Sequence, residues 1–257
     1  MSYTVLLVED EQLVREELAQ TTDWAALGTQ LAGTSADGLD GEAKIRLLDP
    51  DIVITDIRLP GQDGLTMLKN CQVTHAIILS GYTDFSYTRS AIRLGVFDYL
   101  QKPVDNHQLE DAVRALVQKI KEEDQDIIAL HSRVKSSEKE LIELPRSVDN
   151  HIINSVISFI ATNYSHPVGL QEAAEYLELS ESHLSRLFKE ETGLNFLQYL
   201  NAWRINKAAA LMRDPRKNIS EIATDCGFPS PGYFAKIFKR FSGMTPSQYR
   251  DKISLIS

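Results

Sequence analysis

Short apolar runs alternate with helix-length segments through the first half of the chain. The apolar runs, which are candidate strands, cover residues 4–8, 30–35, 51–55, 76–80 and 96–100. The candidate helices between them lie at about residues 11–22, 39–48, 63–71, 84–94 and from Asp105 onward. Alternation of this kind is typical of a parallel α/β sheet. Residues 1–118 are therefore predicted to form a doubly wound, five-stranded parallel sheet.

The last segment, residues 149–257, has a helical pattern throughout and contains an internal repeat. At an offset of 50 residues, Leu184–Lys189 aligns with Phe234–Lys239, and Gly193 aligns with Gly243. Such self-similarity indicates one supersecondary unit used twice. Each copy has a helix, a short turn and a second helix, so the pattern predicts an all-α tandem helix-turn-helix domain.

Capping residues predict where these helices begin and end. In the first copy, a helix at 170–177 and a turn at 178–180 precede a second helix that ends at Gly193, a residue suited to a left-handed cap. In the second copy, Asn218 and Glu221 have the spacing of a capping box. The remaining signals are Gly227, Ser230 followed by Pro231, and Gly243.

A heptad pattern joins the two predicted domains. Apolar residues recur at Leu109, Val113, Leu116, Ile120, Ile127, Leu130, Val134, Leu141 and Leu144, with Glu123 and Ser137 at the two gaps. No Gly or Pro interrupts the pattern before Pro145. We therefore predict a helical linker over residues 119–148, with a coiled coil at 120–144. The alternative is two amphipathic helices that each cover their own domain.

Charge and composition narrow the class of protein. Residues 1–118 carry the net charge of −9, whereas residues 149–257 hold 12 basic and 11 acidic side chains. Global acidity argues against binding to nucleic acid, but the last third escapes that objection. No apolar run approaches the roughly 20 residues of a membrane helix. The two cysteines match no metal spacing, and we expect a cytoplasmic protein with no membrane partner.

Four of the apolar runs end in reactive polar groups. They lead into Glu9-Asp10, Asp56, Ser80 and Lys102. Ligands of parallel α/β sheets bind beyond the carboxyl ends of the strands, so these groups should converge. Mg²⁺ prefers such all-oxygen ligands, and with Mg²⁺ bound Asp56 could attack a phosphoryl donor. Helix capping is the alternative explanation for Asp10 and for Asp63, but it does not explain all four strand ends.

Residues 1–118 resemble the flavodoxin-like receiver domain of two-component response regulators. The matching motifs are Glu9-Asp10, Asp56 to Pro60, Asp63-Gly64, Ser80-Gly81-Tyr82, Tyr99 and Lys102-Pro103. The resemblance implies that Asp56 accepts a phosphoryl group from a sensor histidine kinase. It also implies Mg²⁺ ligation by Asp10, Asp56 and the carbonyl of Arg58, with Glu9 acting through water.

Further roles follow from the same resemblance. Ser80 and Tyr99 would form a switch pair, Lys102 would contact the phosphoryl oxygens, and the Lys102–Pro103 bond would be cis. From spacing alone, Tyr99 would be a strand aromatic that packs on a helix. Glu9 departs from the family pattern, in which Asp is commoner, yet its longer side chain should still reach a metal-bound water.

Residues 150–251 resemble the DNA-binding domain of AraC-type transcription regulators. The motifs are the segment from Leu184 to Gly193, Arg204, Ala208, Ile222-Ala223, Gly227-Phe228, Tyr233-Phe234 through Lys239, and Thr245 to Arg250. Helix geometry assigns Leu187, Phe188, Ile237 and Phe238 to the core. The residues expected to face DNA are Ser182, His183, Ser185, Arg186 and Lys189 on the first recognition helix and Pro231, Gly232, Tyr233, Lys236, Lys239 and Arg240 on the second.

The two recognition helices differ in charge. Residues 180–193 hold two basic and three acidic side chains, whereas residues 230–243 hold three basic and none acidic. Arg186 is therefore the expected base reader, and the second helix is suited to phosphate. For Lys239 or Arg240 alone, a solvated face is an equally good explanation. His183 is better explained as a surface or helix-packing histidine than as a base reader.

Together these features predict a phosphorylation-controlled transcription regulator that binds double-stranded DNA as a homodimer and is not an enzyme. One alternative is an aspartyl phosphatase, which generally needs a second Asp two residues after the nucleophile; here Arg58 occupies that position. Another is a phosphate-independent DNA-binding protein whose receiver is only a dimerisation module.

Overall fold

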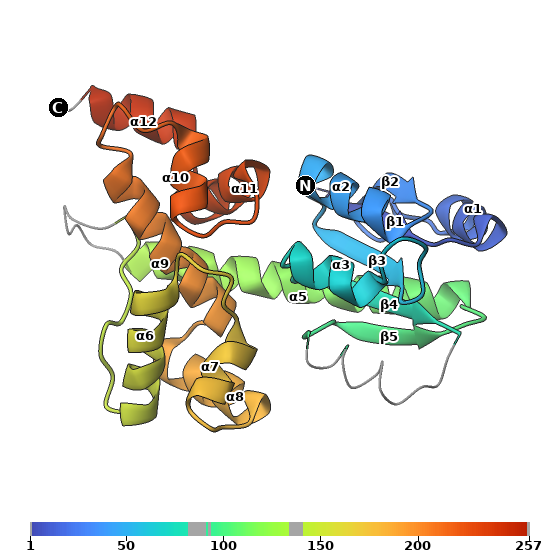
Figure 1. Cartoon of the computed structure of the whole chain (residues 1–257), viewed down its shortest axis with the longest axis horizontal. Helices are drawn as coiled ribbons and strands as arrows, with labels where there is room; N and C mark the ends of the chain where they lie inside the picture. The colour runs from blue at the N-terminus through green and yellow to red at the C-terminus, as the bar shows by residue number, and fades with distance from the viewer. Residues whose placement is uncertain (1, 82–90, 92–93, 134–140, 256–257) are drawn as a thin grey trace. The chain divides into compact units, whose positions relative to one another are not determined.

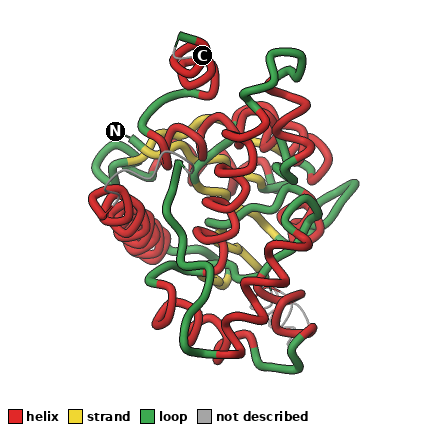
Figure 2. Tube along the Cα trace, turned by 90° about the vertical axis from the view of Figure 1, so that its left-hand side faces the viewer, coloured by secondary structure: helices red, strands yellow, loops and turns green. Residues whose placement is uncertain are grey.

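The computed structural model of the chain describes residues 2–81, 91, 94–133 and 141–255. The chain divides into two compact units, Met1–Glu122 and Glu123–Ser257, which we call the N-terminal and C-terminal units (Figure 1). Strands among the described residues occur only in the N-terminal unit, and the described part of the C-terminal unit consists of helices and loops (Figure 2).

The N-terminal unit is built on a five-stranded parallel sheet in the order β2-β1-β3-β4-β5. The strands are β1 (Tyr3–Val8), β2 (Thr29–Ser35), β3 (Ile52–Asp56), β4 (Ala76–Ser80) and β5 (Asp98–Gln101). All five predicted strands are thereby confirmed, with ends shifted by at most two residues. Every residue of β3 and β4 is buried, as expected for strands with helices on both faces.

Two helical layers cover the sheet. The described helices that cover it are α1 (Gln12–Thr21), α2 (Gly38–Leu48), α3 (Gly64–Asn70) and the first part of α5 (Asn106–Arg133), which runs on past Glu122 into the C-terminal unit. Alternate strand residues face opposite layers: Leu7 and Ile54 pack with α1 and α5, whereas Leu6 and Val53 pack with α2 and α3. Most of the predicted helix at 84–94 lies outside the described residues.

Strand register brings the predicted site residues to one edge. Val8 pairs with Thr55, Asp56 with Leu79, and Ser80 with Gln101. The backbone N–H of Lys102 then donates to the Ser80 carbonyl at 2.8 Å. The Lys102–Pro103 peptide bond is cis, as the resemblance implied. The carboxyl ends of β1, β3, β4 and β5 therefore lie side by side.

The C-terminal unit confirms the tandem helix-turn-helix prediction. Its helices after α5 are α6 (His151–Asn163), α7 (Leu170–Tyr176), α8 (Glu181–Thr192), α9 (Phe196–Leu211), α10 (Ile219–Asp225), α11 (Pro231–Ser242) and α12 (Pro246–Ser254). The pairs α7–α8 and α10–α11 are the two copies of the repeat. Gly193 and Gly243 end α8 and α11 in left-handed conformations, and the capping box of Asn218 and Glu221 is present.

A buried arginine organises the region between the two copies. Arg204 on α9 is 1% exposed, and its guanidinium donates to the carbonyls of Tyr164 and His166 at 2.8 and 2.9 Å. Burial lowers the pKa of Arg204 to about 10. Gly227 meets the same loop: its φ is +79°, and a Cβ there would lie 2.5 Å from the Tyr164 carbonyl oxygen. Both family motifs at these positions therefore have a structural role.

The linker departs from the predicted continuous helix. Helix α5 is described as far as Arg133, residues 134–140 lie outside the described residues, and Leu141 to Asn150 are not helical. Ile142 is 2% exposed in the C-terminal core, and its backbone N–H and carbonyl bond to the side-chain amide of Asn206 at 2.8 and 2.7 Å. The predicted helix through Leu144 is therefore wrong, because residues 141–150 are not helical and the backbone of Ile142 is bonded to Asn206 of α9.

The first part of the heptad pattern is also used within single units. Leu109, Val113, Leu116 and Ile120 lie in the core of the N-terminal unit, whereas Ile127 is 1% exposed in the core of the C-terminal unit. This burial matches the alternative of amphipathic segments that cover their own domains. The predicted domain boundaries at residues 118 and 148 stay predictions, and the two compact units divide at Glu122.

We predict that Gly64→Ala destabilises the N-terminal unit by about 1–3 kcal/mol. A Cβ at Gly64 would lie 2.1 Å from the Asp56 carbonyl oxygen and 3.0 Å from Thr55 Oγ1, so β3 or α3 would have to move. Urea unfolding measures the loss. Gly81→Ala is the control, because a Cβ there meets nothing within 4 Å. Equal unfolding free energies for the two variants would contradict this account.

Candidate functional site

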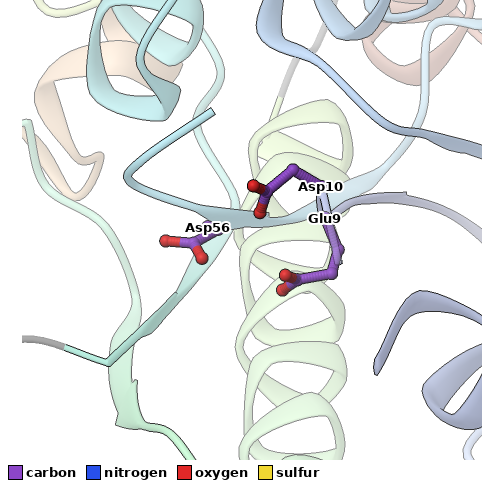
Figure 3. A group of neighbouring side chains, drawn as sticks. All are labelled: Glu9, Asp10 and Asp56. Carbon is purple, nitrogen blue, oxygen red and sulfur yellow. The ribbon is translucent and has the colours of Figure 1, made fainter. Parts of the chain in front are cut away.

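Three carboxylates gather at the edge of the sheet where β1 and β3 end. Glu9, Asp10 and Asp56 each offer an oxygen, and these oxygens all lie within 4.8 Å of one another. Figure 3 shows the three side chains next to one another at the ends of these strands. Glu9 is fully buried, Asp56 is 8% exposed, and Asp10 is exposed. The predicted cluster is therefore present, with an opening on the Asp10 side.

Lys102 holds two of these carboxylates. Its Nζ lies 2.5 Å from Asp56 Oδ2, 2.6 Å from Glu9 Oε1 and 3.5 Å from Glu11 Oε1. Burial alone would lower the pKa of Lys102, but the hydrogen bonds to Asp56 and Glu9 outweigh it and raise that pKa to about 12. Burial raises the pKa of Glu9, and the contact with Lys102 opposes that rise.

The donor set fits a hard divalent cation. Glu9 Oε2 is buried and has no hydrogen-bond partner in the described part of the chain, so one carboxylate oxygen remains available. Capping does not account for Asp10, because the N-cap of α1 is Glu11 and no side chain caps that helix. Carboxylate oxygens with room for water are the ligands that Mg²⁺ prefers. Asp10, Asp56 and Glu9 could hold such an ion.

The neighbouring backbone shapes the pocket around Asp56. The N–H of Arg58 donates to Asp56 Oδ1 at 3.0 Å, and that of Gly64 donates to the Ile57 carbonyl at 2.8 Å. Asp63, unlike Asp10, is an N-cap: its carboxylate accepts from the Thr66 N–H at 2.9 Å. The β3–α3 turn is thus fixed by its own hydrogen bonds.

The predicted switch residues lie on the two strands beyond β3. Ser80 ends β4 and is 1% exposed. Tyr99 on β5 is half-buried and packs against the core cluster of the α2 and α3 layer. This is the packing position that spacing alone suggested for Tyr99, so its role as a switch stays a prediction.

The C-terminal unit presents the predicted contact residues with unequal exposure. Phe188, Ile237 and Phe238 are core residues as predicted, and Leu187 is half-buried against them. The exposed members of the predicted set are Ser182, His183, Arg186, Lys189, Pro231, Gly232 and Lys239. The half-buried members are Ser185, Tyr233, Lys236 and Arg240. Each of the two helices therefore exposes part of its predicted contact set and buries its predicted core residues.

Comparison with known proteins agrees with both parts of the chain. A family model described as the response regulator receiver domain matches residues 5–114, and one described as a helix-turn-helix domain matches residues 173–252. The chain is 34% identical over 255 residues to an uncharacterized response regulatory protein of Staphylococcus epidermidis, which covers 96% of this chain and 98% of that relative. The chain belongs to the response regulators.

Further similarities follow the same division. The transcriptional regulatory protein HptR of Staphylococcus aureus is 31% identical over 253 residues, with 96% of this chain and 98% of HptR covered. Among solved structures, the receiver domain of AraT, a response regulator from Geobacillus stearothermophilus, is 32% identical with a TM-score of 0.46, over 48% of this chain and 98% of that chain. The two family models and the full-length relatives confirm the resemblance to a receiver domain and an AraC-type helix-turn-helix domain.

Within this response regulator, sequence reasoning missed several residues that complete the sites. Glu11 adds a third carboxylate near Lys102, and Arg15 donates to the backbone carbonyls of Glu9 and Asp10 at 2.5 and 3.2 Å. Both follow β1 closely in sequence, so the polar run after that strand was a usable signal. In the helix-turn-helix domain, the residue missed is Asn201, whose side-chain amide donates to the hydroxyl of Tyr233, a predicted DNA contact that also packs beside Phe228.

Membrane association gains no support from the helices. Among the described residues, no helix of this response regulator combines the length and apolar character needed to span a bilayer.

We predict that Lys102→Met lowers the unfolding free energy by on the order of 3 kcal/mol in chelator buffer near pH 7, because a buried carboxylate loses its cation. The pKa of Glu9 is already raised by burial and should rise further without Lys102. The folded state then binds more protons than the unfolded state above the ordinary pKa of 4.5, so stability falls as pH rises. The deficit should therefore be smaller near pH 5.

Urea unfolding at both pH values measures this deficit. Lys69→Met, at an exposed position on α3, is the matched control and should change stability little at either pH. A deficit for Lys102→Met that is independent of pH would show that Glu9 does not depend on this cation.

Proposed function

We propose that this response regulator is a phosphorylation-dependent, sequence-specific DNA-binding transcription regulator of a two-component system. The observation that carries the proposal is the Lys102 ion pair with Asp56, at the open edge of the receiver sheet. It sets a nucleophilic carboxylate, a cation and two further carboxylates together, on a chain that also holds a tandem helix-turn-helix domain. The transcriptional regulatory protein HptR, similar over nearly its full length, supports the proposal.

The chemistry assigned to the receiver is phosphoryl transfer from a sensor histidine kinase. Asp56 supplies the attacking carboxylate oxygen, and the leaving group is the imidazole of the kinase. Lys102 moves from the carboxylate to the new phosphoryl oxygens, and Ser80 donates a hydroxyl proton. Bound Mg²⁺, held by Asp10, Asp56 and the Arg58 carbonyl with Glu9 through water, would neutralise charge between the reacting oxygens.

The chemistry assigned to the C-terminal unit is major-groove recognition. Arg186 on α8 is 71% exposed, and its nearest carboxylate, that of Glu190, is 3.9 Å away, so its guanidinium is available to a guanine edge. Lys239 on α11 is exposed and suited to phosphate. The roles of the remaining predicted contacts belong to the proposal: Ser182, His183, Ser185, Lys189, Gly232, Tyr233, Lys236 and Arg240.

Binding as a homodimer to paired half-sites and residence in the cytoplasm complete the proposal. A cytoplasmic location follows from the DNA partner and from two buried free cysteines. A dimer contact through Ile127 is not part of it, because that side chain lies in the core of its own C-terminal unit.

The alternative of a phosphate-independent protein, whose receiver is only a dimerisation module, makes a different chemical prediction, as does an aspartyl phosphatase. Intact mass after incubation with acetyl phosphate and Mg²⁺ separates them. One stable phosphoryl group supports the proposal, no modification favours the dimerisation module, and rapid turnover of the donor favours a phosphatase.

We predict that Asp56→Asn abolishes phosphorylation by acetyl phosphate while the fold is retained, because the amide is nearly isosteric but not nucleophilic. Intact-mass measurement checks the outcome. Asp63→Asn is the matched control: Asp63 is an exposed helix cap in the same unit, and this variant should still gain one phosphoryl group. Phosphorylation of the Asp56→Asn variant would refute the assignment.

We predict that Arg186→Ala and Lys239→Ala differ in their effects on DNA binding. Loss of a base reader should cost about 1–3 kcal/mol at the cognate site and relax preference at one base pair. Loss of a phosphate contact should weaken binding to all sequences and flatten its salt dependence. Selection of bound sequences followed by titration at several salt concentrations tests both. Equal losses at specific and random DNA would disqualify Arg186 as a reader.

A further inference from the structure

The last turns of α5 carry an acidic run that packs onto the helix-turn-helix domain. The run is Glu122-Glu123-Asp124-Gln125-Asp126, and residues from Glu123 onward belong to the C-terminal unit. In the heptad pattern, Glu123 stands only at a position where an apolar residue would be expected. The structure instead gives its neighbours defined partners on both recognition helices.

One pair is made with each recognition helix. On α11, Arg240 Nε bonds to Asp124 Oδ1, and the same guanidinium lies 4.0 Å from Glu123 Oε2. On α8, Lys189 Nζ lies 3.2 Å from Asp126 Oδ2. Arg240 and Lys189 are both on the predicted DNA-facing set. The segment from Glu123 to Asp126, which we call the acidic cover, therefore occupies cations that phosphate would need.

The acidic cover is anchored rather than loosely tethered. Ile127 follows it directly and is 1% exposed in the core of the C-terminal unit. Gln198, itself 5% exposed, donates from Nε2 to the Glu123 carbonyl at 3.2 Å. These contacts fix the backbone, so the carboxylates lose little further freedom when they pair with the basic side chains.

The acidic cover contacts residues suited to phosphate binding and not those suited to reading bases. Lys189 and Arg240 lie in the last turns of α8 and α11, whereas Arg186 and Gly232 lie nearer the helix starts, where base readers are usually found. Arg186 and Lys239 remain exposed beside the cover. Its effect should therefore fall on the strength of phosphate binding and leave base preference intact.

We propose that the acidic cover of α5 is an autoinhibitory phosphate mimic: its carboxylates hold Lys189 and Arg240, and DNA must displace them to use these cations. The proposal rests on the proposed DNA-binding function. Ion pairs of this exposure each change an equilibrium by up to about fivefold. Together the two pairs would lower the affinity for DNA without abolishing binding, and a rearrangement of this part of α5 that separates them would restore that affinity.

The test is DNA binding by the full-length, unphosphorylated Asp124→Asn/Asp126→Asn variant. The probe is a mixed-sequence duplex, measured by fluorescence anisotropy at several salt concentrations. The variant should bind about threefold to tenfold more tightly than the natural chain. The slope of log affinity against log salt should steepen by up to about two, because Lys189 and Arg240 would each lose one competing carboxylate and could displace counterions from DNA.

A matched control separates this effect from a change in overall charge. The Glu122→Gln/Glu143→Gln variant also removes two negative charges, but from exposed side chains outside the acidic cover. Glu122 directly precedes the cover, and Glu143 lies in the segment that follows α5. The control should bind DNA within about twofold of the natural chain, because salt screens the interaction between exposed charges and the DNA phosphates. The autoinhibitory role would be refuted if both variants gained affinity for DNA equally, or if the Asn variant gained none.

Two further readings keep the outcomes distinct. If the pairs only fasten α5 to the domain, the Asn variant should lose thermal stability and gain no affinity, which also overturns the proposal. If neither the natural chain nor any variant binds DNA, the proposed function itself fails. A third outcome is that the natural chain binds DNA, that Lys239→Ala weakens this binding, and that the Asn variant gains no affinity. DNA binding would then stand, and only the autoinhibitory role of the acidic cover would be refuted.

Discussion

The ammonium group of Lys102 is the cation on which the receiver edge depends. Parallel register forces the ends of β1 and β3 together, and the sequence places carboxylates at both ends. Three negative charges from Glu9, Asp10 and Asp56 meet one positive charge from Lys102, which leaves the pocket short of two positive charges. A bound divalent cation would supply that difference, and this charge balance is what favours Mg²⁺ under the proposed function.

Much of this arrangement could be predicted because its signals are local. Strand ends, capping boxes and the glycines after α8 and α11 depend on a few neighbouring residues, and the register then follows from burial of β3 and β4 on both faces. Asp56 and Lys102 were found in this way. The sequence did not reveal that Asp10 is not a helix cap, because a carboxylate just before a helix usually is one. Only the start of α1 shows that Glu11 occupies the N-cap position.

The linker shows why the remainder could not be predicted. A spacing of three and four residues fits a dimeric seam and a helix that covers its own domain equally well, so periodicity cannot choose between them. What decides is contact between residues far apart in sequence: Asn206 with Ile142 over 64 residues, and Arg240 with Asp124 over 116. No local pattern encodes those partners. The first of them, Asn206, binds the backbone of Ile142 in a segment that is not helical.

The two sites of this chain share one electrostatic device. In the receiver, Lys102 already holds carboxylates before any phosphoryl group arrives; in the helix-turn-helix domain, Lys189 and Arg240 already hold carboxylates of α5. Under the proposed functions, binding at either site would exchange one anion for another, and its free energy would be a difference between two sets of ion pairs. The receiver pair is mostly buried and little screened by salt, whereas the pairs on α8 and α11 are more exposed and screened more strongly. Ionic strength should therefore act on the DNA-binding domain while leaving the phosphoryl site almost unchanged.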